Sequence, residues 1–91
     1  MNRVFYLPSF LKQIEKLRGH EADEVEEALV TFQQFAQTGN KQEGLGFKKI
    51  GDACYEIRVN IRMRIAMKKR PEGYYLAIYG NHDEIEKFLR K

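Results

Sequence analysis

Between Tyr55 and Arg70 the chain alternates between apolar and cationic residues. The apolar set has one parity: Tyr55, Ile57, Val59, Ile61, Met63, Ile65 and Met67. The cationic set has the other parity: Arg58, Arg62, Arg64, Lys68 and Arg70. Because successive side chains of a strand point to opposite faces, this pattern predicts strands with one apolar and one basic face. The apolar face indicates a sheet that lies on a core, and the arginines indicate a surface that meets phosphate.

The first half of the chain predicts one strand followed by two helices. Arg3–Leu7 is apolar enough for a short strand, which Pro8 ends. Ser9 is a candidate N-cap for a helix over Phe10–Arg18, and helical spacing of apolar residues continues over Glu21–Gln37. We expect the two helices to form a hairpin whose apolar stripes are buried against the sheet.

The second half predicts a run of strands and a terminal helix. In chain order we expect a loop leading into a strand at Gly44–Ile50, strands at Cys54–Val59, 63–69 and Tyr74–Tyr79, and a helix at His82–Lys91 that Asn81 caps. A turn over 70–73 follows from Arg-Pro-Glu-Gly.

Loop lengths predict the register of these strands. A three-residue loop over 60–62 keeps the apolar face intact and pairs Val59 with Met63, Ile57 with Ile65, and Tyr55 with Met67. A four-residue turn over 70–73 pairs Lys69 with Tyr74, Met67 with Leu76, and Ile65 with Ile78.

The same registers predict a polar row across three strands. They place Arg58 directly opposite Arg64 and put Tyr79 beside Arg64. Like charges that face each other across strands destabilise a sheet, by some tenths of a kcal/mol. An anionic ligand is one reason for such a pair, and two solvated side chains on an open sheet face are the plain alternative.

The length of the chain fits one small domain over residues 1–91, and the predicted elements fit an α+β fold with the helices on one face of the sheet. Hydrophobic residues make up 43% of the chain and charged residues 32%. No apolar run is long enough to span a bilayer, and the first residues lack a secretory pattern. The lone Cys54 favours a reducing cytoplasm. His20 and His82 lack metal-ligand spacing, so we expect no metal and no small-molecule cofactor.

The basic residues are concentrated in the second half of the chain. Residues 1–44 carry five Lys or Arg against seven Asp or Glu, whereas residues 45–91 carry eleven against six. This asymmetry favours an anionic partner for the second half.

Four segments of the second half resemble the RelE/ParE superfamily of toxins from bacterial and archaeal toxin–antitoxin pairs. They are Leu45–Ile50, Tyr55–Asn60, Arg64-Ile65 and Tyr79–Glu84. The order of the expected elements over nearly the whole chain is similar as well. The resemblance implies an N-terminal strand, a helical hairpin, a three-strand antiparallel meander and a short C-terminal helix.

The RelE branch implies an endoribonuclease that cuts mRNA on the ribosome, contacts ribosomal RNA and is silenced by a cognate antitoxin. Such enzymes act without metal: the 2′-hydroxyl attacks the adjacent phosphate, helped by proton transfer and by cations. Arg64 matches the catalytic arginine of the family, Arg58 the preceding basic residue, and His82 the general acid of YafQ-like members.

Some positions depart from the family pattern. Phe88 stands where RelE carries a tyrosine, and Arg62 and Met63 replace an acidic or amide residue and a tyrosine. The general base therefore stays open among Tyr79, Glu56 and His82.

The sequence hypothesis for the site is thus a phosphate clamp. Arg58 and Arg64 would hold the scissile phosphate, His82 would protonate the leaving oxygen, and Tyr79 would orient or stack a base. Six further residues are expected to contact RNA or the ribosome: Lys48, Lys49, Arg62, Lys68, Lys69 and Arg70. Two alternatives remain, a ParE-like inhibitor of DNA gyrase and a catalytically inactive module that only binds.

Overall fold

A single five-stranded sheet in the order β1-β5-β4-β3-β2 organises the molecule. The computed structural model describes residues 2–90. Its elements are β1 (Arg3–Tyr6), α1 (Pro8–Glu15), α2 (Gly19–Thr38), β2 (Lys48–Gly51), β3 (Cys54–Arg58), β4 (Met63–Arg70), β5 (Gly73–Asn81) and α3 (His82–Leu89). Strands β2 to β5 form an antiparallel meander, and β1 pairs with β5 in parallel. The expected α+β fold is confirmed, but the meander contains β2 as a fourth strand in addition to the three expected.

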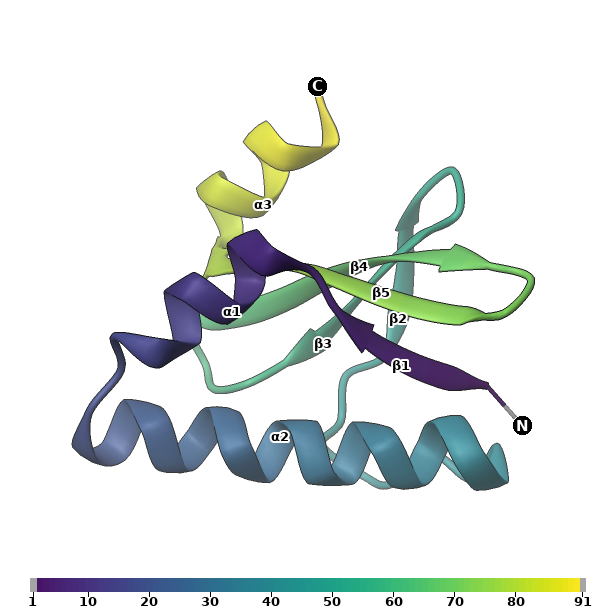
Figure 1. Cartoon of the computed structure of the whole chain (residues 1–91), viewed down its shortest axis with the longest axis horizontal. Helices are drawn as coiled ribbons and strands as arrows, with labels where there is room; N and C mark the ends of the chain where they lie inside the picture. The colour runs from purple at the N-terminus through teal and green to yellow at the C-terminus, as the bar shows by residue number, and fades with distance from the viewer. Residues whose placement is uncertain (1, 91) are drawn as a thin grey trace.

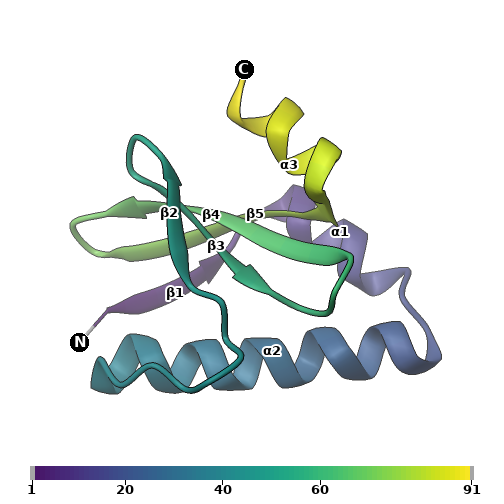
Figure 2. The same ribbon diagram turned by 180° about the vertical axis from the view of Figure 1, so that it is seen from behind.

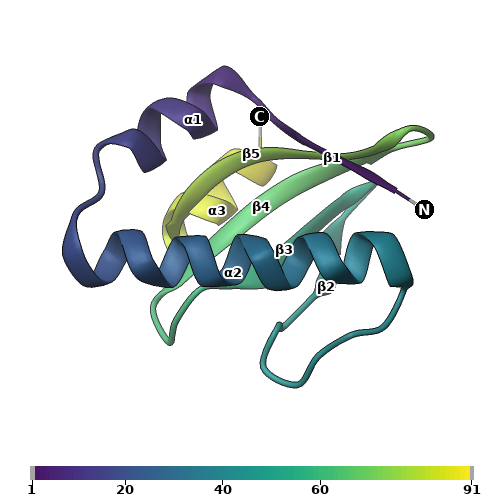
Figure 3. The same ribbon diagram turned by 60° about the horizontal axis from the view of Figure 1, so that its bottom comes forward.

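The helices occupy both sides of this sheet. The long helix α2 lies along one side and α3 stands on the other, as Figures 1 and 2 show from opposite directions. In Figure 3, α2 crosses in front of the sheet while α3 lies behind β4 and β5. The hairpin of α1 and α2 therefore covers the apolar face, and α3 covers part of the opposite face, which we call the open face. The expectation that the helices share one face is wrong for α3, because its apolar side packs on the other face of β4 and β5.

The core fills the space between α2 and the sheet. Its fully buried large side chains come from both helices of the hairpin and from three strands: Phe10, Phe32, Ile57, Ile65, Met67 and Leu76. An aromatic cluster extends the core toward β2, where the rings of Phe47 and Tyr55 stack with centroids 5.0 Å apart. Burial of this apolar area is what holds the hairpin on the sheet.

The predicted register between β3 and β4 is confirmed. Ile57 pairs with Ile65, Tyr55 with Met67, and Arg58 with Arg64. The intervening loop contains Ile61, which is 89% exposed. Ile61 is thus left out of the apolar face, and the apolar residues of β3 and β4 on either side of the loop remain on the same face of the sheet.

The predicted register between β4 and β5 is correct for one half of the ladder and wrong for the other. Lys69 pairs with Tyr74 and Met67 with Leu76 as expected, but a bulge follows and Ala66 pairs with Ile78. The bulge adds one residue, Ala77, to β5 and reverses the facing of everything after it. Ile78 consequently joins the face that α3 covers, and Tyr79 joins the core face.

Details at the helix ends also differ from expectation. Leu7, not Ser9, is the N-cap residue of α1, and it makes no side-chain cap bond. The Ser9 hydroxyl donates instead to the Ala77 carbonyl on β5, at 3.2 Å. The predicted cap of α3 is confirmed, because the Asn81 side chain accepts from the Glu84 amide at 2.9 Å. Lys91, the last residue of the predicted helix, lies outside the described residues.

Within residues 2–90, none of the helices combines the length and apolarity needed to cross a membrane.

Candidate phosphate-binding site

Two arginines face each other on the open face at the ends of neighbouring strands. Arg58 is the last residue of β3 and Arg64 the second residue of β4, and the two are directly paired. The loop over 60–62 is short enough to fix this opposition. The structure therefore brings together the two cations that the sequence predicts for a phosphate clamp.

Arg64 is anchored by contacts with its surroundings. Its terminal nitrogen donates to the Asn60 carbonyl at 2.8 Å, and its Nε lies 3.5 Å from Oε2 of Glu56. Its side chain keeps 23% of its surface exposed. Asn60 is held in turn, since its side-chain oxygen accepts from the Met63 amide at 2.9 Å. These contacts fix the guanidinium before any ligand arrives.

Glu56 is the functional candidate to which the sequence alone gave no definite role. It lies on β3 with 7% of its surface exposed, between Arg64 and Lys48, whose Nζ is 3.8 Å from its carboxylate. Its even-numbered position, two residues before Arg58, was the available signal, because alternation places both residues on the same face. The site thus contains a buried carboxylate beside two cations, and the charge of Glu56 offsets part of the repulsion between the arginines.

Arg58 has more freedom than Arg64. Its side chain is exposed, and within residues 2–90 no carboxylate lies within ion-pair distance of it. Its backbone is fixed by a hydrogen bond that its N–H donates to the Leu45 carbonyl at 2.9 Å. Gly46 allows the loop to lie this close, because a Cβ at Gly46 would stand 2.9 Å from the Cβ of Arg58.

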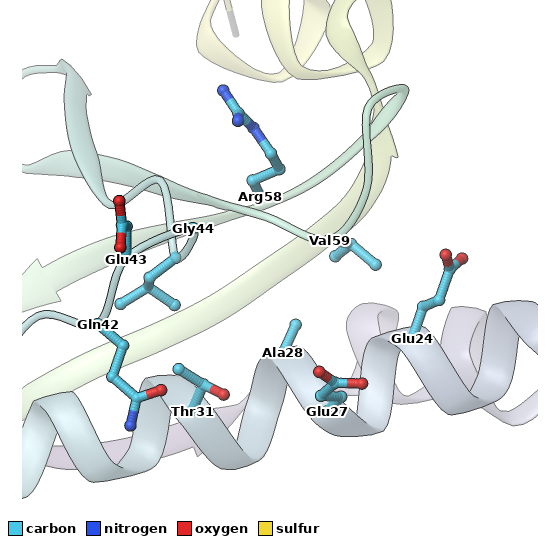
Figure 4. A pocket seen from close by; sticks show the side chains of 10 residues that line it. Glu24, Glu27, Ala28, Thr31, Gln42, Glu43, Gly44, Arg58 and Val59 are labelled. Atoms are coloured by element: carbon cyan, nitrogen blue, oxygen red, sulfur yellow. The ribbon is translucent and has the colours of Figure 1, made fainter.

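A pocket of 380 Å³ lies next to Arg58 but belongs to a different surface. Its walls come from α2, the loop before β2 and the end of β3, and they carry the carboxylates of Glu24, Glu27 and Glu43. In Figure 4 the Arg58 side chain points away from α2, whereas Val59 points toward it. Because these carboxylates repel an anion, this pocket is unsuited to phosphate, and the open face is the candidate surface.

His82 follows β5 directly at the end of the sheet where Arg64 lies. Arg64 pairs with Gly80, two residues earlier, and His82 is the first residue of α3 and exposed. Gly80 allows α3 to begin here, since a Cβ at this position would lie 2.9 Å from the Cβ of Glu84. The fold therefore brings His82 to the same end of the open face as the arginine pair.

Tyr79 is not a neighbour of Arg64, and that part of the predicted polar row is wrong. The bulge pairs Tyr79 with Ile65 and leaves 6% of its surface exposed within the core. Burial raises the pKa of its hydroxyl, and the charges of Glu21 and Glu24 reinforce this. A side chain in this position cannot stack on a base from the open face.

The six residues expected to contact RNA are divided between the two faces. Lys48, opposite Glu56, and Lys68, opposite Cys54, lie on the open face, and by alternation Arg70 does too. Lys49 and Lys69 lie on the opposite face, paired with Tyr55 and Tyr74. Lys69 Nζ lies 5.4 Å from the ring centroid of Tyr74. Arg62 is exposed in the loop between β3 and β4.

No three His, Cys, Asp or Glu side chains gather into a metal-binding group anywhere in residues 2–90. Cys54 is buried, and its cross-strand partner Gly51 lies under the end of α3. A Cβ at Gly51 would lie only 3.3 Å from the Leu89 side chain of that helix.

Comparison with known proteins identifies the fold. No protein-family model matches the chain. No curated protein sequence matches it either. Among solved structures, the YoeB dimer from Staphylococcus aureus matches with a TM-score of 0.68 and 12% identity, over 89% of this chain and 97% of that one.

Two further toxins match over similar lengths. RelE in a RelB–RelE antitoxin–toxin complex from Methanococcus jannaschii gives a TM-score of 0.66 and 15% identity, over 92% of this chain and 96% of that one. YafQ from Escherichia coli matches with a TM-score of 0.69 and 9% identity, over 93% of this chain and 98% of that one. The chain has the fold of the RelE-like toxins, as its sequence motifs predict.

Proposed function

We propose that this protein is the toxin of a toxin–antitoxin pair and acts as a ribosome-dependent endoribonuclease that cleaves mRNA. The observation that carries the proposal is the pairing of Arg58 with Arg64 beside the buried carboxylate of Glu56. The fold shared with YoeB, RelE and YafQ supports it. Two opposed cations and a carboxylate on an open face suit a reaction at an RNA phosphate.

Each residue has a defined role in this scheme. Glu56 accepts the proton of the 2′-hydroxyl, and the freed oxygen attacks the adjacent phosphorus. Arg64 and Arg58 neutralise the charge that develops on the phosphate oxygens. His82 donates a proton to the leaving 5′-oxygen, so the products are a 2′,3′-cyclic phosphate and a 5′-hydroxyl. None of these steps requires a metal ion.

The proposed partners follow from the same surface. A cognate antitoxin with an acidic segment would neutralise the open face, and structures of matching toxins contain the antitoxins RelB and DinJ. Messenger RNA and ribosomal RNA would contact the remaining cations. We place the protein in the cytoplasm, where translating ribosomes are found.

Substitution of Arg64 tests the proposal. Induced expression of the wild-type chain without an antitoxin should arrest growth and leave mRNA fragments with 5′-hydroxyl ends. Arg64→Ala should lower cleavage on the order of 10²- to 10³-fold, because one preorganised donor to the phosphate is lost. Growth curves and mapping of RNA ends in the same cells measure both effects.

Lys12→Ala is the matched control, since Lys12 is exposed on α1. It should remain as toxic as the wild type. Cleavage by the Arg64→Ala variant at the wild-type rate would refute the mechanism. Growth arrest with intact mRNA and a DNA-damage response would instead support a gyrase inhibitor, and harmless expression would support an inactive binding module.

A further inference from the structure

The open face also carries a pair of stacked aromatic side chains, at some distance from the arginine pair. The rings of Phe5 on β1 and Tyr75 on β5 stack with centroids 4.6 Å apart and planes 16° from parallel. They lie on directly paired residues, and both are half-buried. Neither belongs to the core cluster between α2 and the sheet. The pair stabilises the contact between β1 and β5 and leaves the Tyr75 ring on the open face, outside the core.

The Tyr75 ring forms part of a hollow of 260 Å³ whose other walls carry mainly positive charge. The hollow is also lined by Leu7, Lys68, Arg70 and Glu72. Lys68 is the direct cross-strand partner of Tyr75, and both Lys68 and Arg70 are exposed. A flat aromatic surface beside two cations matches a nucleotide, whose base stacks on the ring while its phosphates meet the cations.

Contacts around the hollow hold Tyr75 in place. Its hydroxyl donates to Glu72 at 2.7 Å. This bond raises the pKa of Tyr75 and lowers that of Glu72, so donor and acceptor keep these roles at neutral pH. Phe5 supports the ring from β1. A ring fixed in this way loses little freedom when a base stacks on it.

We propose that Phe5, Tyr75, Lys68 and Arg70 form a stacking site for one nucleotide of single-stranded RNA. This rests on the proposed function, because it adds a subsite for the same substrate. Lys68 lies four residues from Arg64 on β4, which is about 14 Å along the strand. The site binds a nucleotide a short distance from the scissile phosphate and helps to set the path of the RNA.

Binding of a fluorescein-labelled nine-nucleotide oligoadenylate, measured by anisotropy without ribosomes, tests the site. Tyr75→Leu should weaken binding on the order of 10- to 100-fold, because one base loses its stacking partner. Tyr75→Phe keeps the ring but loses the bond to Glu72, so it should bind only slightly more weakly than the wild type. Tyr6→Leu is the matched control, since Tyr6 lies on the core face beside Phe10.

A fluorescent variant keeps the test independent of whether Tyr75→Leu folds. The chain contains no tryptophan, so Tyr75→Trp introduces a single indole at the site. Its fluorescence should be quenched by the oligoadenylate, whereas Tyr6→Trp should not respond. Unchanged affinity of a folded Tyr75→Leu variant, or an unquenched indole in the bound complex, would overturn the proposal.

These results separate the site from the proposed function. If the wild type cleaves mRNA but Tyr75→Leu binds the oligoadenylate normally, the stacking site is refuted and the ribonuclease stands. If Tyr75-dependent binding occurs without cleavage of mRNA, the stacking site stands and the ribonuclease is refuted. Loss of antitoxin binding alone in Tyr75→Leu would assign this surface to the protein partner and refute the RNA site.

Discussion

Arg64 and Arg58 play unequal parts because their surroundings differ. Glu56 and the Asn60 carbonyl hold the Arg64 guanidinium, while Arg58 is exposed and has only its backbone fixed by the loop at Leu45. A preorganised donor needs no rearrangement when charge develops, so in the proposed reaction Arg64 would be the better transition-state contact and Arg58 the better first contact with RNA. The sequence predicts the pair but not this division.

Glu56→Gln separates the carboxylate's chemical role from its structural one. The amide keeps the shape of the side chain but cannot accept the 2′-hydroxyl proton. We expect cleavage to fall by about 10²- to 10⁴-fold while affinity for RNA is unchanged or slightly higher. Single-turnover cleavage of ribosome-bound mRNA and oligonucleotide binding give the two values.

Glu27→Gln is the control for a lost negative charge. Glu27 is an exposed carboxylate of the pocket beside Arg58 and takes no part in the scheme. The Glu27→Gln variant should therefore cleave mRNA at the wild-type rate. A Glu56→Gln variant with normal cleavage would exclude the carboxylate as the base, and one that loses RNA affinity would show that Glu56 only positions Arg64.

At the level of the elements, α1 supplies hydrogen-bond partners to the part of β5 that extends beyond the end of β1. The Gln13 side chain donates to the Tyr79 carbonyl at 2.8 Å and accepts from the Tyr79 amide at 2.9 Å. It thus bonds as a neighbouring strand would. Because an unpaired backbone group in a buried region is costly, this side chain stabilises the bulged half of β5 on which α3 begins.

Gln13→Met should lower the free energy of unfolding by about 2 kcal/mol, because two backbone groups of Tyr79 lose their partners in a side chain of similar size. Urea denaturation measures the loss, and hydrogen exchange at the Tyr79 amide localises it. Gln37→Met, at an exposed position of α2, should change the stability by less than about 0.5 kcal/mol. An equal loss in both variants would show that α1 does not protect this edge.

At the scale of the whole molecule, the sheet separates an apolar side from a basic one. The hairpin of α1 and α2 lies on the apolar face, and α3 packs against β4 and β5 on the other face (Figure 3). Besides Lys48, the open face carries four cations that belong to the two proposed RNA subsites: Arg58, Arg64, Lys68 and Arg70. Their arrangement on one side predicts that the proposed RNA binding has a defined electrostatic component, whatever the net charge of the chain.

The dependence of RNA binding on salt measures that component. With four phosphate contacts on a single strand, the logarithm of affinity should fall with the logarithm of salt at a slope of about −3. Binding should then weaken about 50-fold between 50 and 200 mM salt. Lys68→Ala should reduce the slope by about 0.7, and Lys12→Ala, on α1, should leave it unchanged. Equal effects of both variants would mean that net charge alone attracts the RNA.

The sequence determined the features that depend on neighbouring residues. Alternation set the two faces of β3 and β4, and a three-residue loop fixed their register and with it the opposition of Arg58 and Arg64. Local capping chemistry placed the start of α3 at Asn81. Each of these follows from side-chain period, loop length or a hydrogen bond within a few residues, so a short stretch of chain specifies it.

The tertiary structure decided the features that depend on what covers each face. The bulge at Ala77 moves Tyr79 into the core and Ile78 to the side of α3, and no local pattern marks it. The stacking of Phe5 on Tyr75 joins two strands from opposite ends of the chain. The physical reason for these features is burial. Which face of the sheet a side chain of β5 occupies is decided only when α2 and α3 pack against the two faces.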